Sequence, residues 1–160
     1  MKEKNEIESV EVVGTEGNWE TGIKPYLNEN TNSLTITPKS GRFVLPSYAL
    51  AYDKNSKKLK ELCFDGEISY CVIGEGALKE HPGLESVTFP KDARNVYIHD
   101  NAFEGCSNLN SVNLPEGSSV GNGAFANCSA IKTMRFPNGL NQLNYRMCEG
   151  CTGLEQVDLR

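Results

Sequence analysis

A motif of six residues recurs along this chain at an almost constant spacing, and this repeat constrains the fold more than any other feature. The pattern L-x-x-V-x-L/F occupies residues 84–89, 109–114, 131–136 and 154–159. Steps of 25, 22 and 23 residues separate the central positions Val87, Val112, Met134 and Val157. Pro follows each of the first three copies, and Ala stands seven residues before their first Leu or Ile. A repeat this short cannot bury its own apolar face, so the copies are expected to stack as a solenoid.

Weaker copies precede these four. Residues 59–64 match well, residues 34–38 keep the last apolar pair and a Pro, and residues 7–12 match only as a strand. With all seven copies the average step is 24.5 residues. We therefore predict one repeat array over residues 45–160. Residues 1–44 are either degenerate repeats or a separate N-terminal β cap, which such arrays need to cover an open apolar end.

Each copy of the motif predicts a short strand. Its last two apolar residues alternate with period two, as in a strand with one buried side, and the following Pro ends the strand because it cannot donate a ladder hydrogen bond. Residues 95–98 predict a second short strand on the opposite wall. Residues 100–106 are expected to form a single helical turn, capped by Asp100 or Asn101 and left at Gly105. The predicted fold class is a β-rich α/β solenoid with parallel strands and short helical turns.

The candidate binding residues are the solvent-facing positions of these strands. By alternation they form a polar strip, the surface that repeat proteins commonly offer to partners. Cys63 shares this alternation. The nine candidates are Glu61, Ser86, Thr88, Ser111, Asn113, Thr133, Arg135, Gln156 and Asp158. The other interpretation is that any solvated strand face is polar, and no aromatic cluster marks a tight site on this one.

Four of the six cysteines are expected to serve the core. Cys106, Cys128 and Cys151 share one position of the repeat, and Cys148 occupies the Phe position. A position that is Cys in several copies points inward, where a free thiol behaves as a small hydrophobe. The C-x-x-C pair Cys148 and Cys151 lacks the two further ligands that a zinc site needs and the βαβ context of a redox motif.

No catalytic, cofactor or metal site is expected in this chain. Its two histidines, His81 and His99, lie in no nucleophile or zinc motif. His81 replaces a column cysteine, which favours a packing role, and His99 is expected to be solvated or to cap a turn. We therefore expect a non-enzymatic protein without cofactors.

Charge and hydropathy limit the partners. Sixteen basic and 21 acidic residues give a net charge of −5, which argues against nucleic acid or an anionic membrane as partner. No apolar run approaches the roughly 20 residues of a spanning helix, so no membrane insertion is expected. The first residues, M-K-E-K-N-E, do not form a secretory signal as they stand. A cytoplasmic location is therefore not excluded.

The residues before the motif carry a family resemblance. The combination A-F-x-x-C-x-x-L, at residues 102–109 and with Ile last at 124–131, resembles the BspA-like leucine-rich repeat family. The departures are Leu78 with His81, where Phe and Cys are expected, and Met147 with Cys148, where Ala and Phe are expected. The resemblance implies a right-handed superhelix of about five clear coils.

The resemblance also implies a function. Members of this family are typically secreted or surface-anchored microbial proteins, several of them associated with adhesion. It implies a cell-surface or secreted adhesin-type module that binds a host or matrix protein or glycan. The alternative is an intracellular protein-interaction scaffold or effector domain on the same fold, which free thiols favour. Because Val157 and Leu159 lie on the last strand, an end-to-end dimer through that strand is also expected.

Overall fold

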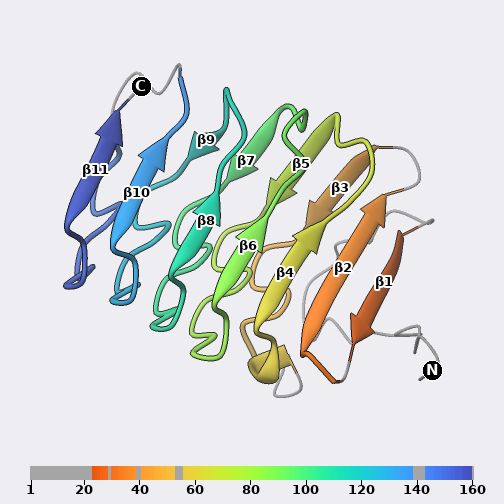
Figure 1. The fold of residues 1–160 in the computed structure, drawn as a ribbon, viewed down its shortest axis with the longest axis horizontal. Coiled ribbons are helices and arrows are strands. Elements are labelled where there is room, and N and C mark those ends of the chain that lie inside the picture. The colour runs from red at the N-terminus through yellow and green to blue at the C-terminus, as the bar shows by residue number, and fades with distance from the viewer. Residues whose placement is uncertain (1–22, 29, 39–40, 53–55, 139–142, 160) are drawn as a thin grey trace.

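The chain folds as a flattened solenoid with two walls of short strands (Figure 1). The structure is a computed structural model, and it describes residues 23–28, 30–38, 41–52, 56–138 and 143–159. The front sheet has the order β1-β2-β4-β6-β8 and the back sheet the order β3-β5-β7-β9. A separate pair, β10-β11, continues the front wall. This confirms the predicted solenoid.

The strands are short, as the motif predicts. In the front sheet they are β1 (Ile23–Asn28), β2 (Ser33–Pro38), β4 (Glu61–Phe64), β6 (Ser86–Thr88) and β8 (Ser111–Asn113). In the back sheet they are β3 (Arg42–Leu45), β5 (Tyr70–Ile73), β7 (Val96–Ile98) and β9 (Ser119–Val120). The front pair consists of β10 (Thr133–Phe136) and β11 (Gln156–Leu159). The position of β7 agrees with the second strand predicted at 95–98.

The registers show that the repeat builds the core. In parallel pairs, Leu62 of β4 stands opposite Leu34 of β2 and Val87 of β6, and Val87 stands opposite Val112 of β8. Leu34, Leu62 and Val87 are buried. Aromatic rings stack in the same way, with Phe64 and Phe89 at 4.7 Å between centroids. Successive coils therefore bury one continuous apolar ladder, which is the main stabilising term.

The N-terminal region joins the array in part. β2 pairs in parallel with β4 and β3 with β5, as regular coils do, whereas β1 runs antiparallel to β2. The expected copy at residues 7–12 lies outside the described residues. The boundary at residue 45 and the choice between degenerate coils and a cap for residues 1–44 stay predictions.

The helical turn expected at residues 100–106 is instead a series of tight turns. Asn101 has φ +55° and Gly105 φ +76°, and such left-handed residues interrupt a right-handed helix. The N–H of Phe103 donates to the carbonyl of Ala124 in the next coil at 2.9 Å. The expected cap also acts between coils, because Asp100 Oδ1 accepts from the N–H of Asn122 at 2.7 Å. The one helix among the described residues is a 3₁₀ turn, η1 (Ser56–Lys58).

The front wall is interrupted at one place. β8 pairs with β6, and β10 pairs with β11, but β8 and β10 are not paired in the structure. The same two coils stay bonded on the turn side, where the N–H of Gly105 donates to Ala126 O at 2.8 Å. The two coils therefore separate at the front strands while they stay in contact on the turn side. Within the described ranges, no helix has the length and apolar character to cross a membrane.

Candidate functional site

The nine predicted strip residues lie on the outward side of the front wall. All of them are exposed or half-buried. The register places Glu61, Ser86 and Ser111 in one row across the sheet. A second row contains Thr88 and Asn113, with half-buried Cys63 beside them. The alternation is confirmed on β4, β6, β8 and β10. On the last strand, β11 (Gln156–Leu159), Val157 and Leu159 are instead exposed. A binding role for the nine residues stays a prediction.

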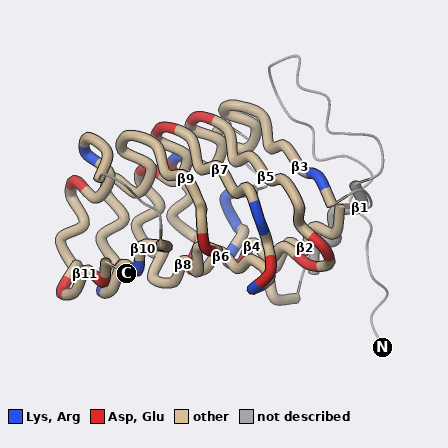
Figure 2. Tube along the Cα trace, turned by 90° about the horizontal axis from the view of Figure 1, so that it is seen from above, with Lys and Arg blue, Asp and Glu red and all other residues tan. Residues whose placement is uncertain are grey.

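On β10 and β11 the strip repeats the same two-row arrangement. Thr133 stands opposite Gln156, and Arg135 stands opposite Asp158. The Nε of Arg135 lies 3.6 Å from Oδ2 of Asp158, and the Arg135 side chain is 67 % exposed. An ion pair this open is worth little because water screens it. Charged residues in general are scattered along the coils (Figure 2), so the strip offers hydroxyl and amide groups rather than a charged patch.

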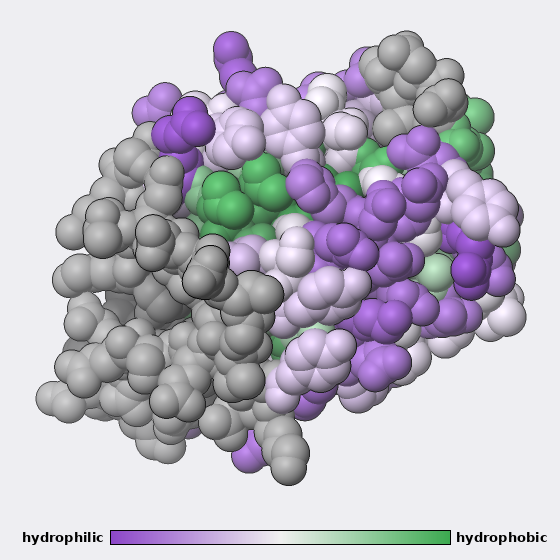
Figure 3. Space-filling model, turned by 180° about the vertical axis from the view of Figure 1, so that it is seen from behind, coloured by the Kyte–Doolittle hydropathy of each residue, from purple (hydrophilic) through white to green (hydrophobic). Residues whose placement is uncertain are grey.

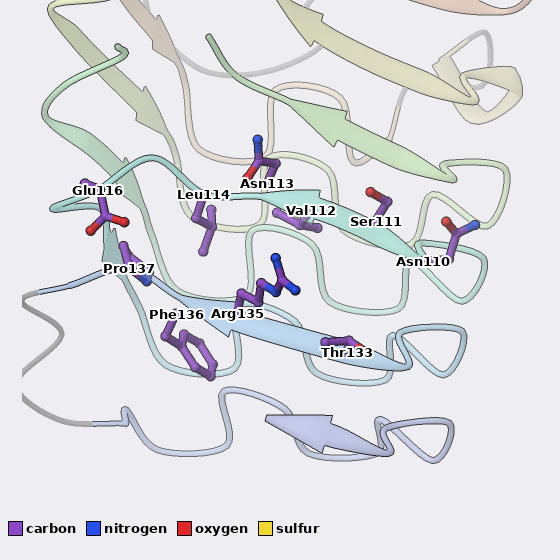
Figure 4. A pocket seen from close by; sticks show the side chains of 10 residues that line it. All are labelled: Asn110, Ser111, Val112, Asn113, Leu114, Glu116, Thr133, Arg135, Phe136 and Pro137. Carbon is purple, nitrogen blue, oxygen red and sulfur yellow. The ribbon is translucent and has the colours of Figure 1, made fainter. Parts of the chain in front are cut away.

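A cavity of about 410 Å³ opens where β8 and β10 separate. We call it the slot. Its lining residues are Asn110, Ser111, Val112, Asn113, Leu114, Glu116, Thr133, Arg135, Phe136 and Pro137. Leu114 from one strand and Arg135 from the other extend into the space between the strands (Figure 4). Four strip residues therefore share one hollow with apolar side chains of the core.

Two hydrogen bonds join the coils of β8 and β10 on either side of the slot. At one end Ser129 Oγ donates to Ser107 O at 3.3 Å, and at the other the N–H of Asn138 donates to Glu116 Oε2 at 2.8 Å. Sequence reasoning missed this site. The available signals were the short step of 22 residues and the presence of Leu114 where the neighbouring coils carry Phe.

The back sheet carries an aromatic row that the sequence interpretation did not identify. The Arg42 guanidinium lies 4.5 Å from the centroid of the Tyr70 ring, and the rings of Tyr70 and Tyr97 are 5.6 Å apart. The face seen from behind shows a small apolar patch bordered by polar residues (Figure 3). Tyr70 stands opposite Arg42 and Tyr97 stands opposite Val72, so the two rings do not share one repeat position and the repeat does not reveal their contact.

The column cysteines are buried, which confirms the core interpretation. Each thiol donates to a backbone carbonyl of the preceding coil: Cys106 to Leu78 O at 3.1 Å, Cys128 to Phe103 O at 3.2 Å, and Cys151 to Phe125 O at 3.1 Å. Burial raises the pKa of the Cys106 thiol to about 12. A thiol that keeps its proton is a poor nucleophile and a poor metal ligand. Cys151 differs, because the hydrogen bond with Cys148 lowers the pKa of its thiol to about 7. All six cysteines lie in the described part of the chain and are free.

The remaining chemical candidates also serve the structure. A hydrogen bond with Cys151 is the main cause that raises the pKa of half-buried Cys148, and burial is the second. His81 is fully buried, with Nδ1 3.0 Å from Leu78 O and Nε2 2.8 Å from Ser56 Oγ. Leu78 belongs to the same coil as His81, so this contact differs from that of a column cysteine. His81 reaches the preceding coil through Ser56, whose hydroxyl donates to Leu50 O at 3.2 Å. His99 is exposed. Across the ranges that the structure describes, no group of three or more His, Cys, Asp or Glu could hold a metal ion.

Solved structures share this fold. A leucine rich cell surface protein from Faecalibacterium prausnitzii superposes with a TM-score of 0.62 at 18% identity, covering 88% of this chain and 42% of that one. A leucine rich repeat protein from T. pallidum gives 0.58 at 18% identity, covering 84% and 67%. A leucine-rich repeat protein from Bacteroides ovatus gives 0.57 at 19% identity, covering 86% and 40%.

This chain thus spans less than half the length of two of these three proteins. No curated protein matches it. The BspA type leucine rich repeat region matches residues 71–160, in six copies. That range is more than half of the 160 residues, and it contains the column cysteines, the slot and most of the strip. The chain therefore belongs to the BspA-type leucine-rich repeat family.

Proposed function

We propose that this chain is a cell-surface binding module that recognises a host or matrix macromolecule through the polar strip of its front wall. The observation that carries the proposal is the strip itself. Exposed hydroxyl and amide side chains stand in register over successive coils, so one partner can contact several coils at once. The surface location is supported by the similar F. prausnitzii protein, which is described as a cell surface protein.

Binding through such a strip sums many modest contacts. The strip carries few charges, and the ion pair between Arg135 and Asp158 is open to water. Each hydroxyl or amide contributes little because binding exchanges its hydrogen bonds with water for bonds with the partner. Loss of a single strip side chain should therefore weaken binding only slightly, and a bulky charged side chain in the strip should block it.

The alternative role is an intracellular scaffold on the same fold. One observation favours it, which is that all six cysteines are free thiols, since secreted proteins commonly form disulfides. Burial of the column thiols weakens this argument, because buried thiols are protected from oxidation whatever the compartment.

Protease shaving of intact source cells distinguishes the two roles. The domain is followed with an antibody against it, and a cytoplasmic protein serves as the control. Loss of the domain while the control is retained supports the surface role. Protection in intact cells, with digestion after lysis, contradicts that role and directs the search to cytoplasmic partners.

The strip itself is tested with purified protein on immobilised matrix proteins. Thr88→Arg and Asn113→Arg each add a long cation to the front strip. Ser119→Arg is the matched control, because Ser119 is exposed on the back strand β9. We expect both front variants to lose binding and the back variant to keep it. Equal binding by all three would show that the strip is not the contact surface.

A further inference from the structure

The interruption between β8 and β10 breaks a regular pattern of backbone hydrogen bonds. In the other described coils of the front wall, two successive N–H groups at the start of a strand donate to one carbonyl of the coil before. The acceptors are Asn32 O, Lys60 O, Glu85 O and Lys132 O. The equivalent acceptor for the coil of β10 is Asn110 O. Among the described residues, no backbone N–H donates to Asn110 O.

Strand alternation identifies the backbone groups that face the slot. The N–H of Ser111 donates to Glu85 O, toward β6, so the backbone groups of the next residue, Val112, point the other way. The N–H of Gln156 donates to Lys132 O, so the backbone carbonyl of Lys132 points toward β11. By alternation, the backbone N–H and carbonyl groups of Thr133 and Arg135 point toward β8. Both walls of the slot therefore present edge donors and acceptors of the kind that an added strand pairs with.

The floor of the slot is apolar. Val112 and Leu114 are half-buried, whereas Val87 and Phe89, at the same positions of the preceding coil, are only 1 % and 3 % exposed. Leu114 is smaller than the Phe residues before and after it in the ladder. The ring that would fill the space is missing, and the neighbouring apolar side chains are left accessible to a small apolar group.

The rim of the slot provides one cation. Arg135 extends into the space between the strands (Figure 4), and its contact with Asp158 on the far side is long, at 3.6 Å. Asn113, across the slot, is uncharged. An acidic side chain placed beside Asn113 would meet the Arg135 guanidinium. Glu116 keeps its negative charge while it accepts from the N–H of Asn138, so the acidic side chain must lie away from that end of the slot (Figure 4).

We propose that the slot binds an extended peptide segment of a partner protein in which small apolar residues alternate with acidic residues. The apolar side chains lie on Val112 and Leu114, the acidic side chains lie at the rim beside Arg135, and the peptide backbone pairs with a strand edge. The inference rests on the proposed function, because it names the kind of segment that the front wall recognises and the point where it binds.

The test uses the full chain and two synthetic peptides, EVEVEVE and KVKVKVK, each with blocked ends and a fluorescent label. Fluorescence anisotropy is expected to show binding of the acidic peptide and weaker binding of the basic one by about tenfold or more, the effect of one charge-assisted contact. A third peptide, EVEPEVE, lacks one backbone N–H and should bind less well. Absence of binding by EVEVEVE up to about 1 mM overturns the proposal.

Two variants test the location. Leu114→Phe restores the aromatic ladder and fills the slot, so it should abolish peptide binding while the circular dichroism spectrum stays that of the parent. Arg135→Glu should reverse the preference toward KVKVKVK. Arg94→Glu is the matched charge reversal, because Arg94 is exposed and lies outside the slot. If Leu114→Phe keeps full binding, or if Arg94→Glu acts like Arg135→Glu, the slot is not the site.

Hydrogen exchange read by NMR supplies a measurement that does not depend on a variant. Before peptide is added, the amides of Val112 and Arg135 should exchange faster than that of Ser111, which is bonded to Glu85 O. With EVEVEVE bound, the exchange rate of the Val112 amide or of the Arg135 amide, or of both, should fall by about tenfold or more. Protection of both amides in the free protein would mean that the slot is closed, and this result overturns the proposal.

The outcomes also separate this inference from the proposed function. Failure of the peptide test, with matrix binding still blocked by Thr88→Arg, overturns the slot and leaves the strip as the contact surface. Peptide binding at the slot, with no effect of the strip variants on matrix binding, supports the slot and contradicts the broad strip. Thr88 is not among the residues that line the slot, so the two readouts are independent.

Discussion

Replacing Gly121 by Ala tests how closely the coils pack at their corner. The N–H of Gly121 donates to Ile98 O at 2.7 Å, so the two coils are in direct backbone contact. A Cβ on Gly121 would lie 2.6 Å from the backbone N of Asp100 and 2.8 Å from the carbonyl carbon of His99. Real Cβ atoms essentially never come within 3.0 Å of another heavy atom. Gly121→Ala must therefore push one coil away from the next.

The expected loss of stability follows from two terms. Forcing an extra methyl group into a packed site typically costs about 1–3 kcal/mol. The same methyl displaces the Asp100 carboxylate, which accepts from the N–H of Asn122 at 2.7 Å, and this partly exposed hydrogen bond adds about 1 kcal/mol. We expect Gly121→Ala to lower the free energy of unfolding by about 3 kcal/mol.

Gly117→Ala is the matched control in the same coil. Gly117 has φ +72° and nothing within 4 Å of a built Cβ, so its substitution measures the left-handed backbone alone. That conformation costs about 1–2 kcal/mol for a non-glycine residue, and reduced freedom of the unfolded chain returns about 0.5–1 kcal/mol. The expected net loss is about 1 kcal/mol.

Urea unfolding followed by far-UV circular dichroism measures both variants. If the slope of the unfolding free energy against urea concentration is the same in both variants, the difference in their stability reflects the folded state. The unfolded-chain term is the same for both Gly→Ala changes and cancels in their difference, so Gly121→Ala should lose about 1–2 kcal/mol more than Gly117→Ala. If Gly121→Ala costs no more than its control, the backbone contact between the coils is not tight and the argument fails.

Three further predictions concern the cysteines. Iodoacetamide at neutral pH should label half-buried Cys63 before Cys106, checked by mass spectrometry, because burial raises the pKa of Cys106 to about 12. The free energy of unfolding should fall as pH rises from about 9 toward 12, because buried Cys71 and Cys106 keep their protons in this range only in the folded state. Cys106→Ser should reduce the dependence of the unfolding free energy on pH by up to about 1.4 kcal/mol per pH unit. Cys128→Ala should cost about 2–3 kcal/mol in urea unfolding and Cys128→Ser less, because serine keeps a donor for the Phe103 carbonyl.

The sequence predicted the parts of this fold that repeat. Val87 and Val112 stand opposite each other because each coil presents the same residue at the same place, and a parallel register follows from the period alone. The buried position of Cys106 followed from the same argument, since a position occupied by Cys in several coils must point inward. The role of its thiol did not follow, because its partner, Leu78 O, belongs to another coil.

The turns were harder to predict because their backbone is decided between coils. Residues 100–106 have the composition of a helical turn, and Asn101 is an acceptable cap. In the structure, the carbonyls of the next coil compete for the N–H groups of this segment, and Asn101 at φ +55° turns them outward. Asp100 likewise caps Asn122 of the next coil. Local propensity cannot report a hydrogen bond whose partner lies a full repeat away.

The candidate site divides in the same way. Alternation located the strip, because any outward position of a strand such as Thr88 is set by period two. It could not distinguish a binding residue from a merely solvated one, because any polar side chain is compatible with the fold at an outward strand position. The slot is different. Leu114 occupies a ladder position that Phe89 and Phe136 fill in the coils before and after it, and the smaller side chain leaves part of the ladder open. Departures from local consistency concentrate at functional sites. In a chain built from copies, the copy that fails to fill its own ladder is therefore the stronger candidate for a specific partner.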